Sequence, residues 1–262
     1  MQDRSQRIVK QHLRTDALLG VELVPRGEAP EAPAPQAPSP ARSASSAPAA
    51  APAPAAPAPP APSPELGRSE KLRVLQAMDE QEVRGCEKCE LCHGRTNTVF
   101  GEGAPDAPIM FIGEGPGQTE DEQGRPFVGR AGNLLTKMIE AMGFSREQVY
   151  IANVVKCRPP NNRTPTPAEV QTCWDYLRRQ IETIRPRAIV TLGAPATKML
   201  LGTKTGITRL RGTWHEYAGV NPPVPVMPTF HPAFLLRAYT KENRAKVWSD
   251  LQAVMSRVQQ GD

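Results

Sequence analysis

Four of the five cysteines fall into two pairs whose spacing suits a thiolate metal site. The first pair is Cys86-x2-Cys89, and the second is Cys157-x15-Cys173. Thiolates are ligands for soft metals, which here means either zinc or an iron–sulfur cluster. Cys92 lies three residues beyond Cys89, so a ligand set that includes the three N-terminal cysteines stays open. The spacing therefore predicts a metal site rather than disulfides, without fixing all of its ligands.

Three polar segments outside the cysteine pairs also contain residue types found in active sites. The first, from Gly113 to Arg130, combines glycines with acidic side chains and an aromatic ring. Its GxGxG start suggests dinucleotide binding, but Pro116 and the long loop before the next helix argue against a Rossmann turn. The second is Asn153, and the third is the run HPAFLLR that begins at His231. A lone Asn or His at a strand end is often structural, so neither residue identifies a reaction by itself.

Alternating strands and helices are expected to position these segments. Strands are predicted at residues 108–113, 149–155, 187–193 and 224–230, and helices at residues 68–84, 131–142, 167–184, 195–201 and 242–259. Thr166 and Glu169 form a capping-box pattern at the start of the helix that contains Cys173. The alternation predicts an α/β fold, a three-layer α/β/α sandwich around a mostly parallel four-stranded sheet. Because ligands bind at the carboxyl ends of such strands, the polar segments after the first, second and fourth strands are expected to meet.

The chain divides into a neutral tail and a basic folded part. Residues 28–67 form an Ala/Pro-rich linker with 13 of the 29 prolines, which is expected to be extended and disordered. Residues 1–27 place apolar side chains at roughly helical spacing, typical of a short amphipathic segment that packs weakly on the core or docks on a protein partner. Residues 1–67 hold six basic and six acidic residues, so the net charge of +5 belongs to residues 68–262. This part, the expected catalytic domain, suits a polyanion such as nucleic acid.

The sequence also argues against a membrane or secreted protein. It has no run of about 18 apolar residues, so no membrane-spanning helix is predicted. The N-terminal residues are charged and lack an apolar h-region, so no secretory signal is predicted. Both observations favour a cytoplasmic protein, in which cysteines stay reduced and are free to bind metal.

Four motifs in this order resemble those of the iron–sulfur uracil-DNA glycosylases known as family 4. They are GEGPG-x2-E, GRPFVGRAG, the run NVVKCRPPNNRTP and HPAFLLR, within a similarity from about Gly85 to the C-terminus. The resemblance implies the uracil-DNA glycosylase fold and an enzyme that hydrolyses the N-glycosidic bond of flipped-out uracil in DNA. The abasic site that remains would start base excision repair. A related branch bonds covalently to DNA through a KRRIH insertion, which this chain lacks, so covalent trapping is not expected.

The same resemblance assigns roles to single residues. Cys86, Cys89, Cys157 and Cys173 match the ligands of a [4Fe–4S] cluster, and Cys92 falls outside that set. This centre is expected to be structural.

The resemblance also outlines an active site. Glu114 and Gly115 match the first catalytic motif, Glu120 matches a second carboxylate, and His231 matches the histidine of the second motif. Uracil would be bound by Glu114, Gly115, Phe127, Asn153 and His231. In this site the Phe127 ring stacks on the base, and the Asn153 amide reads N3–H and O4. His231 and the Gly115 N–H stabilise the negative charge that develops at O2. Either carboxylate is suited to position the attacking water.

Other functions and partners stay open on the sequence. A non-catalytic iron–sulfur DNA-binding module would bind DNA without releasing a base. A glycosylase for another deaminated base would need a pocket that admits a purine. Five arginines are candidates for phosphate contacts: Arg125, Arg130, Arg209, Arg211 and Arg237. The expected partner is uracil-containing DNA, and the protein is expected to be a monomer.

Overall fold

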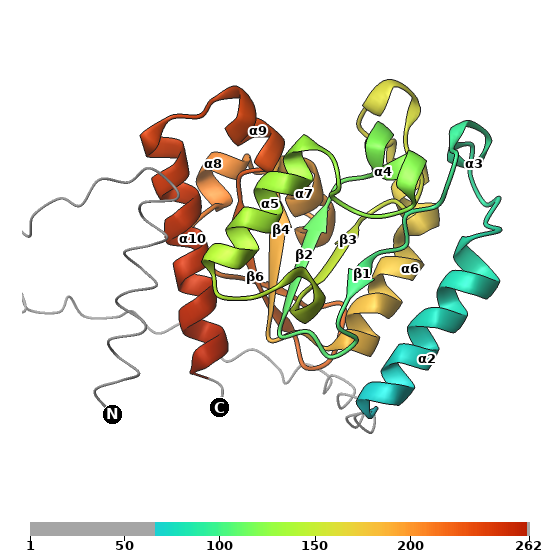
Figure 1. The fold of residues 1–262 in the computed structure, drawn as a ribbon, viewed down its shortest axis with the longest axis horizontal. Helices are drawn as coiled ribbons and strands as arrows, with labels where there is room; N and C mark the ends of the chain where they lie inside the picture. The colour runs from blue at the N-terminus through green and yellow to red at the C-terminus, as the bar shows by residue number, and fades with distance from the viewer. Residues whose placement is uncertain (1–65, 261–262) are drawn as a thin grey trace, which may run out of the picture.

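A six-stranded sheet forms the centre of the computed structural model, which describes residues 66–260 (Figure 1). The strand order is β1-β3-β2-β4-β6-β5. The strands are β1 (Glu102–Gly103), β2 (Ile109–Gly113), β3 (Tyr150–Asn153), β4 (Ala188–Leu192), β5 (His215–Tyr217) and β6 (Val224–Thr229). The four central strands β3, β2, β4 and β6 are parallel, and the two edge strands are antiparallel to their neighbours. The predicted N-terminal segment (residues 1–27) and residues 28–65 of the predicted linker lie outside the described residues.

The four predicted parallel strands are confirmed, and two short edge strands are added to them. β2 and β4 are buried along their whole length, which explains why they appear in the sequence as unbroken apolar runs. β1 has two residues and β5 has three, so neither is long enough to give a periodic pattern. The sheet is therefore six strands wide rather than four.

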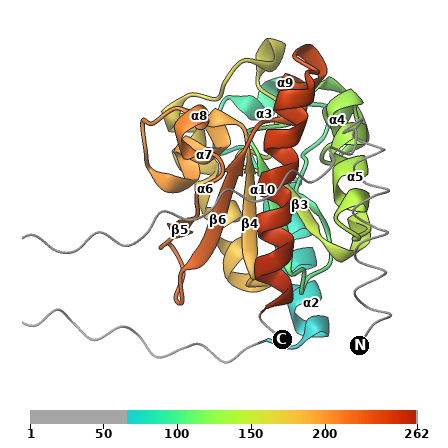
Figure 2. The same cartoon turned by 90° about the vertical axis from the view of Figure 1, so that its left-hand side faces the viewer.

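Helices cover both faces of the sheet, as the α/β/α prediction requires. The helices are α2 (Arg68–Met78), η1 (Asp79–Val83), α3 (Leu91–Gly94), α4 (Gln118–Gln123), α5 (Arg130–Ala141), η2 (Arg146–Gln148), η3 (Pro160–Asn162), α6 (Pro167–Ile184), α7 (Ala194–Leu201), α8 (Ile207–Leu210), α9 (Pro232–Arg237) and α10 (Lys241–Gln259). Side chains of α2, α6 and α7 pack on one face, and those of α5, α9 and α10 pack on the other. In the ribbon of Figure 2, α7 and α5 lie on opposite sides of the sheet. Within residues 66–260, no helix is long and apolar enough to cross a membrane.

The start of α6 forms as its capping pattern predicts. Thr166 Oγ1 accepts from the Glu169 amide at 3.3 Å, and the Glu169 carboxylate accepts from the Thr166 amide at 2.7 Å. Arg163 donates to both Glu169 oxygens, and this pairing lowers the pKa of Glu169 to about 2. The cap fixes the first turns of α6, where Cys173 lies.

Arg211 belongs to a buried ion pair, so its prediction as a phosphate ligand is wrong. Its guanidinium donates to both oxygens of Asp250, at 2.5 and 3.1 Å, and to the Lys246 carbonyl at 2.6 Å. Thr229 Oγ1 donates to Asp250 as well, at 2.6 Å. The Asp250 side chain is fully buried and that of Arg211 is 15% exposed. The pair joins α8 and α10 to the end of β6.

Replacement of Arg211 by Met should destabilise the protein without weakening DNA binding. The variant leaves the Asp250 carboxylate buried without its cation, which typically costs about 3–5 kcal/mol. For a domain of this size that corresponds to a fall in Tm of roughly 10 °C. Arg209→Met, at an exposed position on α8, is the control and should leave Tm unchanged. A parent-like Tm for Arg211→Met, with a weaker salt dependence of DNA binding, would contradict the structural role.

Candidate functional site

Asn153 is the last residue of β3, and its side-chain oxygen lacks a protein partner. The residue is 1% exposed, and Oδ1 accepts no hydrogen bond within residues 66–260. An unsatisfied buried acceptor costs about 1–3 kcal/mol, so a donor on a ligand is the natural partner. Beyond β3, Val154 N donates to the Gly113 carbonyl at 2.9 Å and Val155 N to the Glu114 carbonyl at 3.2 Å. These bonds hold Glu114 beside the chain that carries Asn153.

The Phe127 ring meets the Asn153 amide at Gly113, the last residue of β2. A Cβ on Gly113 would lie 2.4 Å from Asn153 Oδ1 and 2.5 Å from Phe127 Cζ, closer than atoms approach. Phe127 is buried, and its φ of 52° places its backbone in the left-handed region. Its ring also lies 5.7 Å from the His231 ring, centroid to centroid, at an angle of 34°. An aromatic face, an amide and an imidazole therefore converge at one end of the sheet.

His231 follows β6 and caps the N-terminus of α9. Its Nδ1 accepts a hydrogen bond from the Ala233 amide at 3.0 Å. Burial lowers the pKa of His231 to about 4, and the nearby charge of Arg237 adds to this effect. The ring is therefore neutral near pH 7. Because Nδ1 is an acceptor, the single ring proton lies on Nε2, where it is available as a donor.

Glu114 and Gly115 continue the chain directly after β2. Burial raises the pKa of Glu114, while a hydrogen bond with the Thr164 side chain opposes the rise. A Cβ on Gly115 would lie 2.8 Å from Val155 Cγ2, so glycine allows this loop to pack against the segment after β3. The segment of Glu114 and Gly115 thus lies next to the segment that carries Asn153, as the carboxyl-end argument predicts.

Glu120 makes backbone contacts that the sequence analysis did not predict. Its Oε1 accepts from the amides of Val128 at 2.9 Å and Gly129 at 2.8 Å, and Gly129 is the N-cap of α5. The carboxylate therefore caps α5 and closes the loop that carries Phe127. Its neighbour Asp121 is also engaged, since it accepts from the amides of Thr96 and Asn97.

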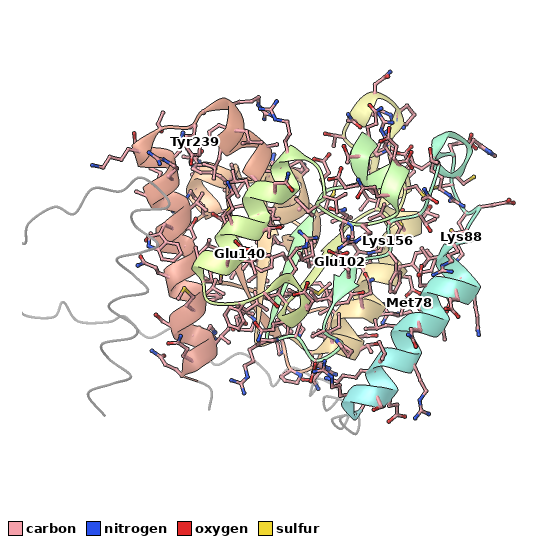
Figure 3. All side chains as sticks on the ribbon, in the orientation of Figure 1. Met78, Lys88, Glu102, Glu140, Lys156 and Tyr239 are labelled. Carbon is pink, nitrogen blue, oxygen red and sulfur yellow. The ribbon has the colours of Figure 1, made fainter. Side chains whose placement is uncertain are left out.

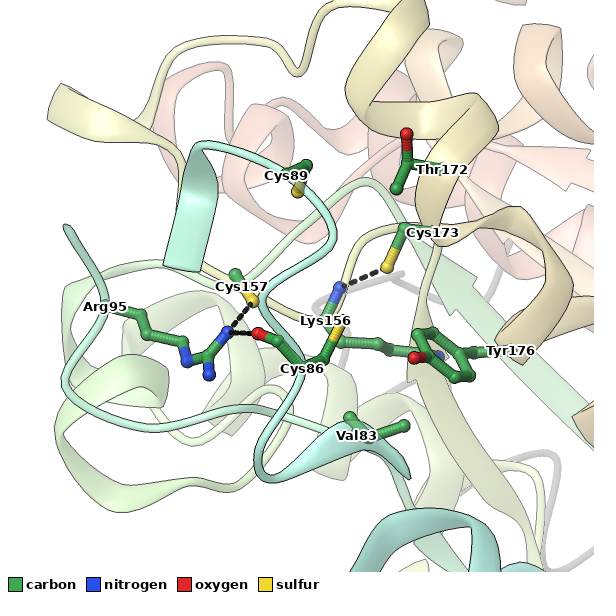
Figure 4. Close-up of a pocket in the computed structure, with 9 residues that line it drawn as sticks. All are labelled: Val83, Cys86, Cys89, Arg95, Lys156, Cys157, Thr172, Cys173 and Tyr176. Carbon is green, nitrogen blue, oxygen red and sulfur yellow. Dashed lines mark hydrogen bonds between the residues drawn. The ribbon is translucent and has the colours of Figure 1, made fainter. Parts of the chain in front are cut away.

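The four paired cysteines line a pocket between η1, α6 and the segment after β3 (Figure 4). The remaining lining residues are Val83, Arg95, Lys156, Thr172 and Tyr176. Cys92 is not among them. Arg95 Nη1 donates to Cys157 Sγ at 3.1 Å, and the Lys156 amide donates to Cys173 Sγ at 3.3 Å. Donors aimed at sulfur are typical of the surroundings of thiolate-bound metal centres.

The chemistry of these cysteines fits a thiolate-bound group. Burial raises the pKa of Cys173 to about 11 and also raises the pKa of Cys89 and Cys157, so without a cation they stay protonated. A bound metal centre deprotonates such thiols. In residues 66–260 no three His, Cys, Asp or Glu side chains are arranged to hold a metal ion. A single ion needs its ligand atoms close together, whereas the cysteine sulfurs that hold a cluster are farther from one another.

Lys156 connects the cysteine pocket to Asn153, a role that the sequence alone does not predict. Its Nζ donates to the Asn153 carbonyl at 2.9 Å and to Gln180 Oε1 at 2.6 Å, and the side chain is fully buried (Figure 3). Burial lowers the pKa of Lys156 to about 8. The one hint in the sequence is that Lys156 directly follows the predicted buried strand 149–155. A lysine in a buried segment needs hydrogen-bond partners from the protein, because water does not reach its charge.

Comparison with known proteins identifies the family. The profile of the uracil DNA glycosylase superfamily matches residues 100–252, more than half of the chain. A type-4 uracil-DNA glycosylase of Thermotoga maritima is 49% identical over 183 residues, covering 70% of this chain and 94% of that protein. Proteins with the same name are 51% identical in Sulfurisphaera tokodaii, over 60% of this chain and 74% of the relative, and 44% identical in Archaeoglobus fulgidus, over 69% and 92%. Together with the convergence of the motif residues at the carboxyl end of the sheet, these matches show that the chain belongs to the uracil-DNA glycosylase superfamily and, within it, to the type-4 uracil-DNA glycosylases.

Proposed function

We propose that this protein is a uracil-DNA glycosylase that hydrolyses the N-glycosidic bond of uracil in DNA and leaves an abasic site. The buried, unpartnered Oδ1 of Asn153 beside the Phe127 ring is the observation that carries the proposal. It offers an acceptor and a stacking face to a flat base. A base inside a duplex cannot reach a buried amide, so the nucleotide must flip out of the stack.

Asn153 and Phe127 divide the recognition of uracil between them. Asn153 Oδ1 accepts from uracil N3–H, and its Nδ2 donates to O4. Cytosine has an acceptor at N3 and a donor at N4, so the same amide orientation opposes both of its groups. Stacking on the Phe127 ring adds about 1–3 kcal/mol by analogy with other base–aromatic contacts.

His231 stabilises the leaving base. As the glycosidic bond breaks, negative charge grows on uracil, mainly at O2. The neutral imidazole, with its proton on Nε2, donates to this oxygen, and the Gly115 N–H is a second donor. The preset tautomer means that no proton has to move on the ring before the bond breaks.

Glu114 is the better of the two carboxylates for positioning the attacking water. Glu120 uses one oxygen to cap α5 through two backbone amides, whereas the Glu114 carboxylate has a hydrogen bond with the exposed side chain of Thr164 and none of these amide partners. A carboxylate next to the sugar also stabilises the positive charge that develops there. Glu120 contributes by holding the Phe127 loop.

The pocket of Cys86, Cys89, Cys157 and Cys173 would hold a [4Fe–4S] cluster. Its ligands come from the segment after η1, from the segment after β3 and from α6, so a cluster would join these three parts. The hydrogen bonds from Arg95 and the Lys156 amide to two of the sulfurs support this assignment. Such a cluster would supply structure, and the residues around Asn153 would carry out the reaction.

Residues outside the two pockets serve binding. Arg130, Arg209 and Arg237 are exposed and suit DNA phosphates. Arg125 donates to Glu102 instead, so it is left out of the proposed phosphate contacts. We propose that residues 28–67 act as a linker and residues 1–27 as a docking peptide for a protein partner. We propose that the glycosylase domain acts as a monomer.

A labelled oligonucleotide with a single uracil tests the proposed function directly. Incubation with the protein followed by alkali should cleave the strand at the uracil. Matched oligonucleotides with hypoxanthine or xanthine test the alternative of another deaminated base. Binding without base release from any of them would instead favour a non-catalytic module.

His231→Asn should slow base excision strongly while leaving the fold intact. The asparagine oxygen can replace Nδ1 as the acceptor for the Ala233 amide, but the variant lacks the Nε2–H donor. Removal of one such donor typically lowers the rate by about 10²–10³. His231→Ala, which loses the cap as well, should show the same rate defect and a lower Tm. A parent-like single-turnover rate for His231→Asn would remove this residue from the mechanism.

Asn153→Asp should lose most activity on uracil and gain trace activity on cytosine. An ionised aspartate has only acceptors, so it opposes O4 of uracil and accepts from N4–H of cytosine. Single-turnover rates on oligonucleotides with one uracil or one unpaired cytosine measure both effects. If the variant excises uracil at the parent rate, Asn153 does not read the base.

Cysteine variants test the cluster. Protein purified anaerobically should be brown and contain iron. Ala at position 86, 89, 157 or 173 should lose the iron and much of the soluble yield, because each substitution removes a ligand. Cys92→Ala is the matched control and should keep both. Zinc in place of iron in the anaerobic protein would contradict the cluster assignment.

A further inference from the structure

The stacking residue Phe127 has a backbone conformation that is unfavourable by itself. Its φ of 52° lies in the left-handed region, which residues with a Cβ avoid. Its carbonyl also lies against α5, since a Cβ on Gly132 would come within 1.9 Å of the Phe127 oxygen. The loop would relax to another conformation unless other groups held it, and the ring would then leave the pocket.

Two charged side chains hold the loop from opposite sides. Glu120 accepts from the amides of Val128 and Gly129, which follow Phe127. Arg146 donates through Nη1 to the Phe127 carbonyl at 3.0 Å and through Nη2 to the Pro126 carbonyl at 2.8 Å. One side chain thus binds the donors of the turn, and the other binds its acceptors.

Arg146 is itself held rigidly. Its guanidinium donates to Thr136 Oγ1 at 3.0 Å, and Nε donates to Glu102 Oε1 at 3.0 Å. Glu102, on β1, is labelled in Figure 3. The Arg146 side chain is only 14% exposed, so its hydrogen bonds are shielded from water, which favours stronger bonds than at the surface.

We propose that Arg146 is a positioning residue for uracil recognition. It fixes the Phe127 ring against Asn153 and His231 by holding the two carbonyls that flank the Phe127 Cα, those of Pro126 and of Phe127 itself. The guanidinium suits this task because its planar fork presents several donors in fixed directions. This role rests on the proposed function, since the ring matters only if a base stacks on it.

Arg125 provides a matched control. It binds the same carboxylate, with Nε 2.8 Å from Glu102 Oε2, but its side chain is 60% exposed. None of its hydrogen bonds goes to the Phe127 or Pro126 carbonyl. Arg125→Met therefore removes a cation from Glu102 and leaves the Phe127 loop held.

Arg146→Met should lower kcat/KM for uracil excision about 5- to 100-fold, the range expected for loss of one base–aromatic stack. Arg125→Met should change it less than twofold at fixed salt. Arg146→Lys should be intermediate, because one ammonium cannot replace the whole fork. The decisive comparison uses Phe127→Leu as background, in which Arg146→Met should have little further effect. Full losses from both changes in the double variant would overturn the proposal, as would a parent-like Arg146→Met.

A second measurement does not depend on the substrate. Hydrogen exchange of the 125–131 peptide should be faster in Arg146→Met, and in Arg146→Lys to a smaller degree, but not in Arg125→Met. Unchanged exchange in both Arg146 variants would also overturn the proposal. If the parent protein leaves uracil DNA intact while exchange responds as expected, the proposed function fails and the hold on the loop stands. If the parent protein excises uracil and both Arg146 variants behave like the parent, the proposed function stands and the positioning role of Arg146 fails.

Discussion

The site depends on the close approach of strands β2 and β3 at the carboxyl end of the sheet. Gly113 of β2 pairs in register with Asn153 of β3, and no side chain fits between them and the Phe127 ring. A shift of the register by one residue would turn the Asn153 side chain to the other face of the sheet. The same pairing continues beyond both strands and brings Glu114 to Val155. Because Gly113 has no Cβ, the Asn153 amide and the Phe127 ring have room to lie together at this end of the sheet.

The cysteine pocket and the proposed uracil site share one short stretch of chain. Asn153 belongs to the proposed uracil site and Cys157 to the cysteine pocket, only four residues later. Lys156 lies between them, with its amide on Cys173 and its Nζ on the Asn153 carbonyl. Gln180 of α6 accepts from the same Nζ and donates to the Tyr150 hydroxyl of β3. These two hydrogen bonds connect α6 to β3. Order around the cysteines and order around the base are therefore linked through buried hydrogen bonds.

Much of this arrangement follows from the sequence, and the part that does not has a common physical cause. The parallel strands are predicted because their apolar runs are local, and the meeting of the motifs follows from the rule for carboxyl ends. The roles of Arg146 and Arg211 were missed because their carboxylate partners lie 44 and 39 residues away, and no periodicity connects them. The cap formed by Glu120 was missed for a related reason. Its partners are backbone amides, which every sequence contains.

The cap at His231 ties the chemistry to a small piece of secondary structure. Catalytic histidines often owe their tautomer to a buried carboxylate. At His231 a peptide N–H at the start of α9 sets the tautomer instead, and α9 has six residues. Short helices at a surface open more readily than the core of a sheet. Whenever the first turn of α9 opens, Nδ1 loses its donor and the ring is free to exchange its proton between the two nitrogens. The fraction of molecules with the donor in place is therefore set by the local folding equilibrium of this helix rather than by an acid–base partner.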